Sequence, residues 1–271
     1  GERLVQYFDK SRMEITNPNA TDDGLWYVTN GLLVRELISG MMQVGDAAFM
    51  AHDPAEIGVA GDPDDTSGPT YAALAGVLNA PAAADGAQIT QRIDRDGNVT
   101  NDPNLAGMNI TAAYRVQVPG IDHQVASPFW EFLNSSGPVR INGQNANERL
   151  FDPWFYATGL PITEAYWANV KVGGTPRLVL LQCFERRCLT YTPGNPAGFR
   201  VEAGNVGQHY HHWRYDILPG EQTPTATEYA FSHQWGSLYA AVPPLVGPVG
   251  VQVDGNTFWA VDTDSGRFLQ F

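Results

Sequence analysis

Three histidines, His209, His211 and His212, form the most specific set of potential metal ligands in the sequence. On an extended strand, His209 and His211 project from the same face, which is the spacing that a two-histidine metal site needs. No H-E-x-x-H or comparable signature accompanies them. Two interpretations follow: a metal-dependent hydrolase site, or an aromatic packing stripe that includes Tyr210 and Trp213.

Two acidic loops supply the hard oxygen ligands that Ca²⁺ prefers. The first contains Asp62, Asp64 and Asp65, and the second has the sequence Asp-Arg-Asp-Gly-Asn at 94–98. Neither completes an EF-hand, and clusters of Asp, Gly and Asn also form ordinary turns. The sequence therefore leaves a calcium site or plain turns as alternatives, and it calls for no other cofactor.

Cys183 and Cys188 are the only two cysteines and lie five positions apart. They form a disulfide if they face each other across a hairpin, and their proximity favours this over a catalytic thiol. The free thiol stays the alternative, because Arg186 and Arg187 would lower the pKa of a thiolate beside them. The sequence has no G-x-S-x-G nucleophile elbow and no glycine-rich phosphate loop, so we predict that the protein is not an enzyme.

Aromatic side chains are dense between residues 130 and 167. Exposed aromatic rings stack on the apolar faces of sugars, whereas buried ones form the core of a glycine-rich β fold. Both interpretations apply to this segment. The residues of the candidate carbohydrate-binding platform are Trp130, Trp154, Tyr156, Tyr166 and Trp167.

The charge and composition of the chain exclude several classes of protein. Its 271 residues include 29 acidic and 16 basic ones, a formal net charge of −13. This balance argues against nucleic-acid binding, which requires clustered cations, and against docking on anionic lipid. No apolar run approaches the roughly 18–20 residues of a membrane span. The 28 glycines and 19 prolines indicate short strands joined by many turns.

The elements that position these residues include an internal repeat. Residues 4–15 and 180–191 each begin with an apolar pair, Gln, one further residue, Phe and an acid. Each then passes through basic residues into a second apolar strand, a Pro/Asn loop, a further strand and a glycine, Gly31 or Gly204. Two apolar runs around polar turn residues predict a hairpin. We expect a mainly β fold of repeated β-hairpin modules, with a loop-rich insert and few short helices.

The same pattern divides the chain into five segments. Residues 1–46 are a first, partial module, 47–128 the insert, 129–216 the second module, 217–230 a linker, and 231–271 a terminal β-hairpin segment. Four N-x-S/T sequons permit glycosylation of a secreted chain. They are Asn19, Asn98, Asn109 and Asn134.

Three stretches of the second module carry a family resemblance. Thr-Gly-Leu-Pro-Ile-Thr-Glu-Ala at 158–165, Gln-Cys-Phe-Glu-Arg-Arg at 182–187 and Val-Glu-Ala-Gly-Asn-Val-Gly at 201–207 resemble the LGFP-type repeats of secreted, Chloroflexi-type cell-surface proteins. The first copy, from Leu4, resembles the second half of such a module. The C-terminal stretch 247–271 resembles a single NHL propeller repeat, which does not bury both its faces alone.

The resemblance implies an extracellular protein of the bacterial cell surface that binds or anchors to cell-wall material. From it we expect a non-catalytic structural protein, a homo-oligomer that self-associates into a fibre or array by completing β-modules between chains. The first alternative is a carbohydrate-binding module that recognises cell-wall glycan through the aromatic platform. The second alternative is the metal-dependent hydrolase using the histidines.

Overall fold

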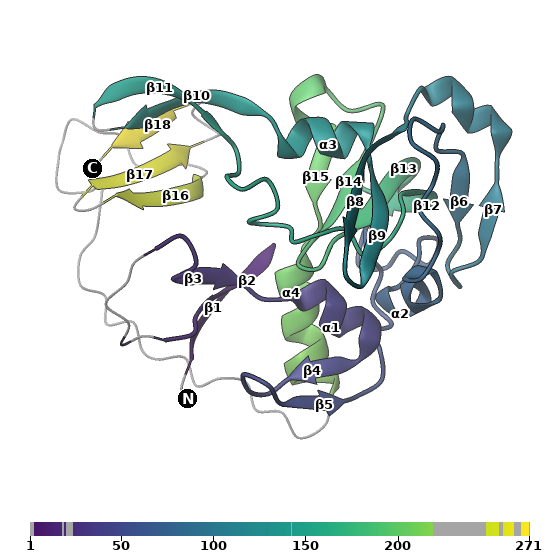
Figure 1. The fold of residues 1–271 in the computed structure, drawn as a ribbon, viewed down its shortest axis with the longest axis horizontal. Coiled ribbons are helices and arrows are strands. Elements are labelled where there is room, and N and C mark those ends of the chain that lie inside the picture. The colour runs from purple at the N-terminus through teal and green to yellow at the C-terminus, as the bar shows by residue number, and fades with distance from the viewer. Residues whose placement is uncertain are drawn as a thin grey trace. The chain divides into compact units, whose positions relative to one another are not determined.

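The computed structural model (Figure 1) describes residues 3–17, 19, 24–141, 143–218, 248–254, 257–262 and 267–270. The chain forms two compact regions, residues 1–221 and residues 222–271. Strands hold 38% of the residues and helices 20%, so the predicted mainly β fold with few short helices is confirmed.

The first module begins with a three-stranded antiparallel sheet. It consists of β1 (Leu4–Phe8), β2 (Ser11–Ile15) and β3 (Val28–Asn30), and the helix α1 (Leu33–Ser39) follows it. The helix ends at Gly40, which has a φ of 70°. A Cβ atom there would lie 2.0 Å from the carbonyl oxygen of His52, so both the backbone angle and the close approach require glycine.

The second module belongs to a six-stranded sheet. Its strand β13 (Thr175–Cys183) pairs antiparallel with the neighbours on both sides, and its apolar run is explained by burial of both faces. The helix α4 (Val206–His211) follows the last strand of the module. The sheet has the order β15 (Val201–Ala203), β14 (Cys188–Tyr191), β13, β12 (Tyr166–Val172), β6 (Gln91–Ile93) and β7 (Val99–Asn101), with β6 parallel to β12.

The two modules share one register of strand pairing. Tyr7 pairs with Arg12 in the first hairpin as Cys183 pairs with Cys188 in the second. The third strand of each module, β3 or β15, pairs antiparallel with the second strand in the same register. The glycine that follows it makes an equivalent bond: Gly31 N–H donates to the Arg12 carbonyl at 2.8 Å, and Gly204 N–H donates to the Cys188 carbonyl at 3.0 Å. Both stretches therefore form a β-hairpin followed by a third strand, in an equivalent register.

Each module's hairpin turn accepts hydrogen bonds from the helix of the other module. The Asp9 carbonyl, in the first turn, accepts from the backbone N–H groups of Gly207 and Gln208 in α4. The Glu185 carbonyl, in the second turn, accepts from the backbone N–H of Arg35 in α1. Side chains of the same residues also bond: Gln208 donates to the Asp9 carboxylate at 2.8 Å, and Arg35 donates to the Glu185 carboxylate at 3.0 Å. These bonds satisfy amides at both helix starts.

The strands β12, β13 and β14 separate two hydrophobic cores. Leu181 and Cys183 face the first core, which also contains α1 and α4. Leu180, on the opposite face of β13, and Phe184, which directly follows the strand, belong to the second core. The helix α3 (Ser127–Leu133) covers that second core with Phe129 and Leu133. Alternation along a strand therefore gives the second module two buried faces.

The insert adds two hairpins and short helices to this framework. The Asp-Gly pair at 96–97 forms the turn of the β6–β7 hairpin, where Gly97 has a φ of 85°. Residues 71–77 form α2 (Tyr71–Leu74) and a 3₁₀ turn (Ala75–Val77). The insert also contains β8 (Ala112–Val118) with β9 (Ile121–Ala126) and a 3₁₀ helix at Pro103–Met108. The pair β4 (Met41–Gln43) and β5 (Phe49–Ala51) spans the start of the insert, and β10 (Ser136–Ile141) with β11 (Gln144–Arg149) and a 3₁₀ helix at Ala197–Phe199 follow it.

The strand predicted for the histidine cluster is wrong. His209 and His211 lie in α4, and a π-helical segment (His212–Ile217) continues it. Val206, Tyr210 and Trp213 are buried at spacings of four and three residues, and this helical period outweighs the local alternation.

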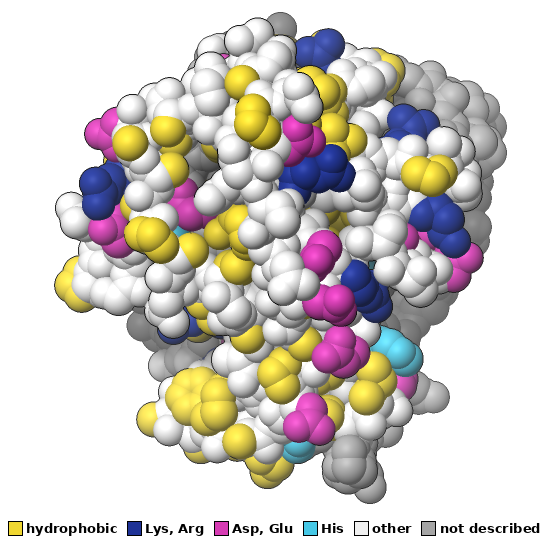
Figure 2. All heavy atoms as spheres, turned by 90° about the vertical axis from the view of Figure 1, so that its right-hand side faces the viewer, with side chains coloured by type: hydrophobic (Ala, Val, Ile, Leu, Met, Phe, Trp, Pro, Cys, Tyr) yellow, Lys and Arg dark blue, Asp and Glu magenta, His cyan; other side chains and the backbone are white. Residues whose placement is uncertain are grey.

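The terminal region is a three-stranded antiparallel sheet of β16 (Pro248–Asp254), β17 (Thr257–Asp262) and β18 (Arg267–Gln270). Most of the predicted linker, 217–230, lies outside the described residues. Among the described helices, none has the length and apolar character to span a bilayer. On the face of the molecule shown in Figure 2, acidic and basic side chains lie close to one another rather than in separate areas.

Candidate functional site

Six aromatic side chains form a continuous ridge on the first compact region. Four come from the 130–156 segment, and two others complete it. We call this set the aromatic ridge: Trp26, Tyr114, Trp130, Trp154, Phe155 and Tyr156.

The rings of the ridge contact each other in sequence. Tyr114 on β8 stacks on Trp130 of α3, with centroids 3.8 Å apart and planes 5° from parallel. Trp154 meets both of them edge-on, at 6.2 Å and 5.4 Å. Phe155 continues the row to Trp26, whose ring lies 6.4 Å away at 17°. Such stacked and edge-to-face pairs hold the rings in fixed orientations.

The ridge is partly open to solvent. Trp26 is 50% exposed and Tyr114 42%, while Trp130 and Trp154 are half-buried against the second core. Tyr156 is anchored, because its hydroxyl donates to the carbonyl of Val28 at 2.7 Å. Within the described part of the chain, the indole N–H groups of Trp26, Trp130 and Trp154 and the hydroxyl of Tyr114 have no hydrogen-bond partner.

Tyr166 and Trp167, the other two predicted platform residues, lie in the protein core. They are 1% and 0% exposed on β12, and they point to opposite cores. The indole of Trp167 donates to the carbonyl of Ile89 at 2.8 Å. Burial, and then the charge of Glu164, raises the pKa of Tyr166 to about 12. The density of aromatic residues in the sequence indicated the segment, but it did not separate these core rings from the exposed ones.

The three histidines of the cluster face different partners. The Nδ1 atom of His209 lies 3.0 Å from the Tyr71 hydroxyl, and that of His212 lies 2.9 Å from an Asp216 oxygen. His211 packs on the rings of Tyr7 and Tyr215. Consecutive helical positions turn by about 100°, so His209 and His211 point in opposite directions. Among the described residues, no three His, Cys, Asp or Glu side chains are grouped to hold a metal ion.

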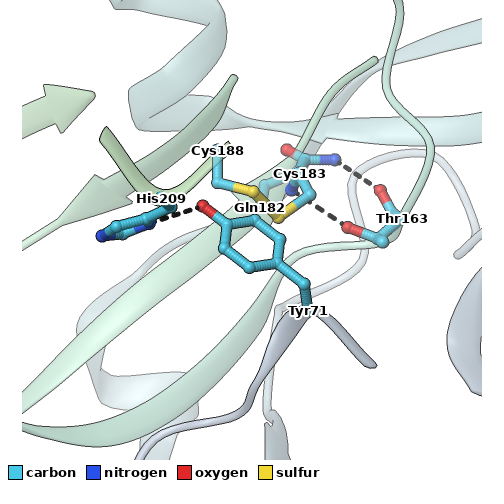
Figure 3. The surroundings of a disulfide bond; sticks show 6 residues. All are labelled: Tyr71, Thr163, Gln182, Cys183, Cys188 and His209. Carbon is cyan, nitrogen blue, oxygen red and sulfur yellow. Dashed lines mark hydrogen bonds between the residues drawn. A yellow bond between two sulfur atoms is a disulfide. The ribbon is translucent and has the colours of Figure 1, made fainter. Parts of the chain in front are cut away.

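Cys183 and Cys188 form a disulfide that is buried at the end of the β13–β14 hairpin (Figure 3). This confirms the pairing that their spacing favoured. In Figure 3, the Tyr71 ring and His209 lie near one side of the bridge. Thr163 fixes the strand beside it, because its hydroxyl accepts from the Cys183 N–H at 3.1 Å. Burial raises the pKa of Tyr71, and it lowers the pKa of His209 to about 4, helped by the charges of His212 and Lys10.

The first acidic loop uses its carboxylates to fix the chain. Asp62 accepts from the N–H groups of Gly173 and Gly174, and these bonds lower its pKa. Asp65 accepts from Ser67 and from the Lys171 N–H, while Asp64 forms a 2.5 Å ion pair with the Lys171 ammonium. The second loop is a turn in which Asp94 accepts from the backbone at 96 and 98. These contacts give both loops a structural role as turns.

The sequons differ in how accessible their amide nitrogens are. Asn98 donates to both oxygens of Asp94, and Asn134 donates to the carbonyl of Trp130 at 2.9 Å. The Asn109 amide makes a 3.4 Å bond to Gly107 on the surface, and Asn19 is exposed.

No local sequence pattern marks Trp26 and Tyr114 as platform residues, and none indicates the contacts of His123. The ring of His123 is buried between Glu164, at 3.1 Å, and the carbonyl of Leu78, at 3.2 Å. It borders a cavity of about 500 Å³. Since these residues come from distant parts of the chain, no local spacing indicates their proximity.

Comparison of the chain with protein-family models, curated proteins and solved structures finds no match.

Proposed function

We propose that this protein is a non-catalytic, extracellular glycan-binding module of the bacterial cell surface. The observation that carries the proposal is the aromatic ridge, in which partly exposed rings are held in a row by contacts with one another. Rings fixed in advance lose little conformational entropy when a ligand stacks on them.

The chemistry of the ridge suits a polysaccharide better than a purely apolar ligand. Sugar rings present apolar C–H faces to aromatic rings and hydroxyl groups at their edges. Among the described residues, the N–H groups of Trp130 and Trp154 and the Tyr114 hydroxyl have no hydrogen-bond partner, so they are available to bond those hydroxyls. The row of rings, which extends to Trp26, suits a chain of sugars rather than a single one.

Retention of the purified protein on insoluble peptidoglycan tests the proposal, with chitin as a second polymer. We expect the full chain to be retained and the Tyr114→Ala and Trp154→Ala variants to bind about tenfold more weakly, as loss of one stacking ring costs roughly 1–2 kcal/mol. Phe199→Ala is the matched control, because Phe199 is 68% exposed and lies outside the ridge. Near-native circular dichroism establishes folding of each variant.

Two results would reject the glycan proposal. One is the absence of retention of the unmodified chain on either polymer. The other is an equal loss of binding in Phe199→Ala and in the ridge variants, which would point to adhesion through exposed aromatic residues in general.

A second candidate function, self-association into a fibre or array, is favoured by the β10–β11 ribbon. Val139 and Ile141 are 41% and 44% exposed on one face of this ribbon. Within the described residues, β10 and β11 pair only with each other, and open strand edges are templates for further pairing. Light scattering with negative-stain electron microscopy tests it: filaments or sheets support it, and a strict monomer at high concentration rejects it.

A further inference from the structure

The outer face of the first module is uncovered where the corresponding face of the second is buried. In the shared register, Leu4, Phe8 and Met13 correspond to Leu180, Phe184 and Leu189. The first three side chains are 54%, 43% and 36% exposed, and their counterparts are 0%, 0% and 1% exposed. One pattern of apolar residues thus occurs in two different environments.

A defined segment covers the face of the second module. Its strand β12 pairs along β13, and Phe129 and Leu133 of α3 join Leu180 and Phe184 in the second core. The buried Gln182 bonds to this covering segment, because its side chain accepts from the Ala126 N–H and donates to the carbonyls of Gln124 and Thr163. The corresponding residue of the first module, Gln6, is exposed.

The strand edges differ in the same way. On β13, Leu181 pairs with Tyr166 of β12, and Cys183 bonds to the backbone of Ile162 and the hydroxyl of Thr163. The same register turns the N–H and C=O groups of Val5 and Tyr7 to the outer edge of β1. Within the described part of the chain, β1 pairs only with β2.

We propose that β1 and the face formed by Leu4, Gln6, Phe8 and Met13 are a docking site for a polypeptide segment with the chemistry of residues 121–174. The docked segment adds an antiparallel strand to β1, supplies a hydroxyl to the Tyr7 N–H, and lays a short apolar helix over Phe8. The molecule's own copy of this segment is already buried in the second module, so the occupant is a separate stretch of polypeptide with that pattern. This is β-augmentation, in which backbone bonds give affinity and side-chain pockets give specificity.

A tethered copy of the covering segment tests the proposal. A second copy of residues 121–178 is placed directly before Arg3 of the full chain, so that its strand reaches β1 through the turn that joins β12 to β13. We expect the Val5 and Tyr7 amides to exchange with deuterium at least about tenfold more slowly than in the unmodified chain. Phe8→Asp in the fusion is the control, because a charge is tolerated on the exposed face but not under a docked helix.

The outcome is decided in three ways. Unchanged exchange of Val5 and Tyr7 in a folded fusion overturns the proposal, as does slowed exchange that Phe8→Asp does not reverse. If exchange of these amides in the unmodified chain becomes slower as the protein concentration rises, the occupant is a second copy of the chain, and this also overturns the proposal. If the fusion fails to fold, a synthetic peptide of residues 158–174 is added to the full chain, and exchange at Val5 and Tyr7 that it does not slow rejects the docking site.

Discussion

The two modules share a register but close the same position of the hairpin by different chemistry. In the second module, Cys183 and Cys188 form a disulfide, whereas in the first Tyr7 faces Arg12. Arg12 is buried with ion pairs to Glu14 at 2.6 Å and Glu36 at 3.6 Å, and its guanidinium lies 4.9 Å from the centre of the Tyr210 ring. The backbone pairing therefore does not depend on one kind of side-chain link.

The ionisation of these groups follows from their burial. Burial alone would lower the pKa of Arg12, but Tyr210 and Glu14 more than offset this, and the pKa is raised. Burial raises the pKa of Glu36 despite the opposing charge of Arg12. A buried ion pair contributes little net stability but is costly to break, whereas a disulfide acts mainly by restricting the unfolded chain. The comparison shows two physically distinct means of holding one geometry.

The equivalent phenylalanines give the largest expected difference between the modules. Phe184→Ala removes a fully buried ring and should lower the free energy of unfolding by about 4 kcal/mol. Phe8→Ala removes a ring that is 43% exposed and should cost less than about 1 kcal/mol. Urea unfolding of both variants measures the difference. Equal losses would mean that the outer face of the first module is already covered.

The fourth residue of each module's helix gives the next largest effect. It is Glu36 in α1 and His209 in α4. The pKa of His209 falls from 6.5 to about 4 on folding, chiefly through burial. The unfolded chain binds the proton more readily, so stability present above pH 6.5 is lost as the pH falls toward 4, by about 3 kcal/mol.

Urea unfolding of the protein and of His209→Gln between pH 7.5 and 4 checks this sign. The variant keeps a polar group near Tyr71 and should lose less stability across that interval. An identical pH dependence of the two proteins would mean that His209 takes up its proton without cost to the fold. Glu36 acts in the opposite direction, since a raised carboxyl pKa gives stability that is lost as the pH rises.

Removal of the disulfide should have a smaller effect. The Cys183→Ala, Cys188→Ala double variant is expected to lose about 2 kcal/mol, because the closed loop is short. Chemical denaturation with and without a reductant measures this in the unmodified chain as well. A loss as large as that of Phe184→Ala would show that the bridge determines the pairing of β13 with β14.

The exchanged contacts between helices and turns should give the smallest effect. Arg35→Ala and Gln208→Ala each remove one side-chain bond to the other module's turn, and each should cost less than about 1 kcal/mol. Thermal unfolding of both variants gives the values. A markedly larger loss in one of them would show that the two contacts are not equivalent in energy.

Much of the hairpin framework was predictable from the sequence because local patterns determine it. Alternating apolar residues around a polar turn specify β1–β2 and β13–β14, and the Asp96–Gly97 pair specifies β6–β7. The cysteine spacing was sufficient to predict the disulfide. The helix at His209 was missed because its buried residues follow a period of about 3.6, which a short histidine-rich stretch conceals.

The candidate site was only partly predictable, since tertiary contacts assemble it. Trp130 and Trp154 came from local aromatic density, but Trp26 and Tyr114 join them from distant segments. Tyr166 and Trp167 fit the same compositional pattern, yet β12 is buried on both faces. Only the position of that strand between two cores separates core rings from ridge rings.

The exchange of hydrogen bonds between Asp9 and α4, and between Glu185 and α1, has a consequence for how the chain can be divided. Neither module carries the partner for the start of its own helix. An excised module would therefore expose helix amides that only the other satisfies. Although the sequence pattern divides them into separate segments, we expect that neither module folds when expressed alone and that the two unfold together.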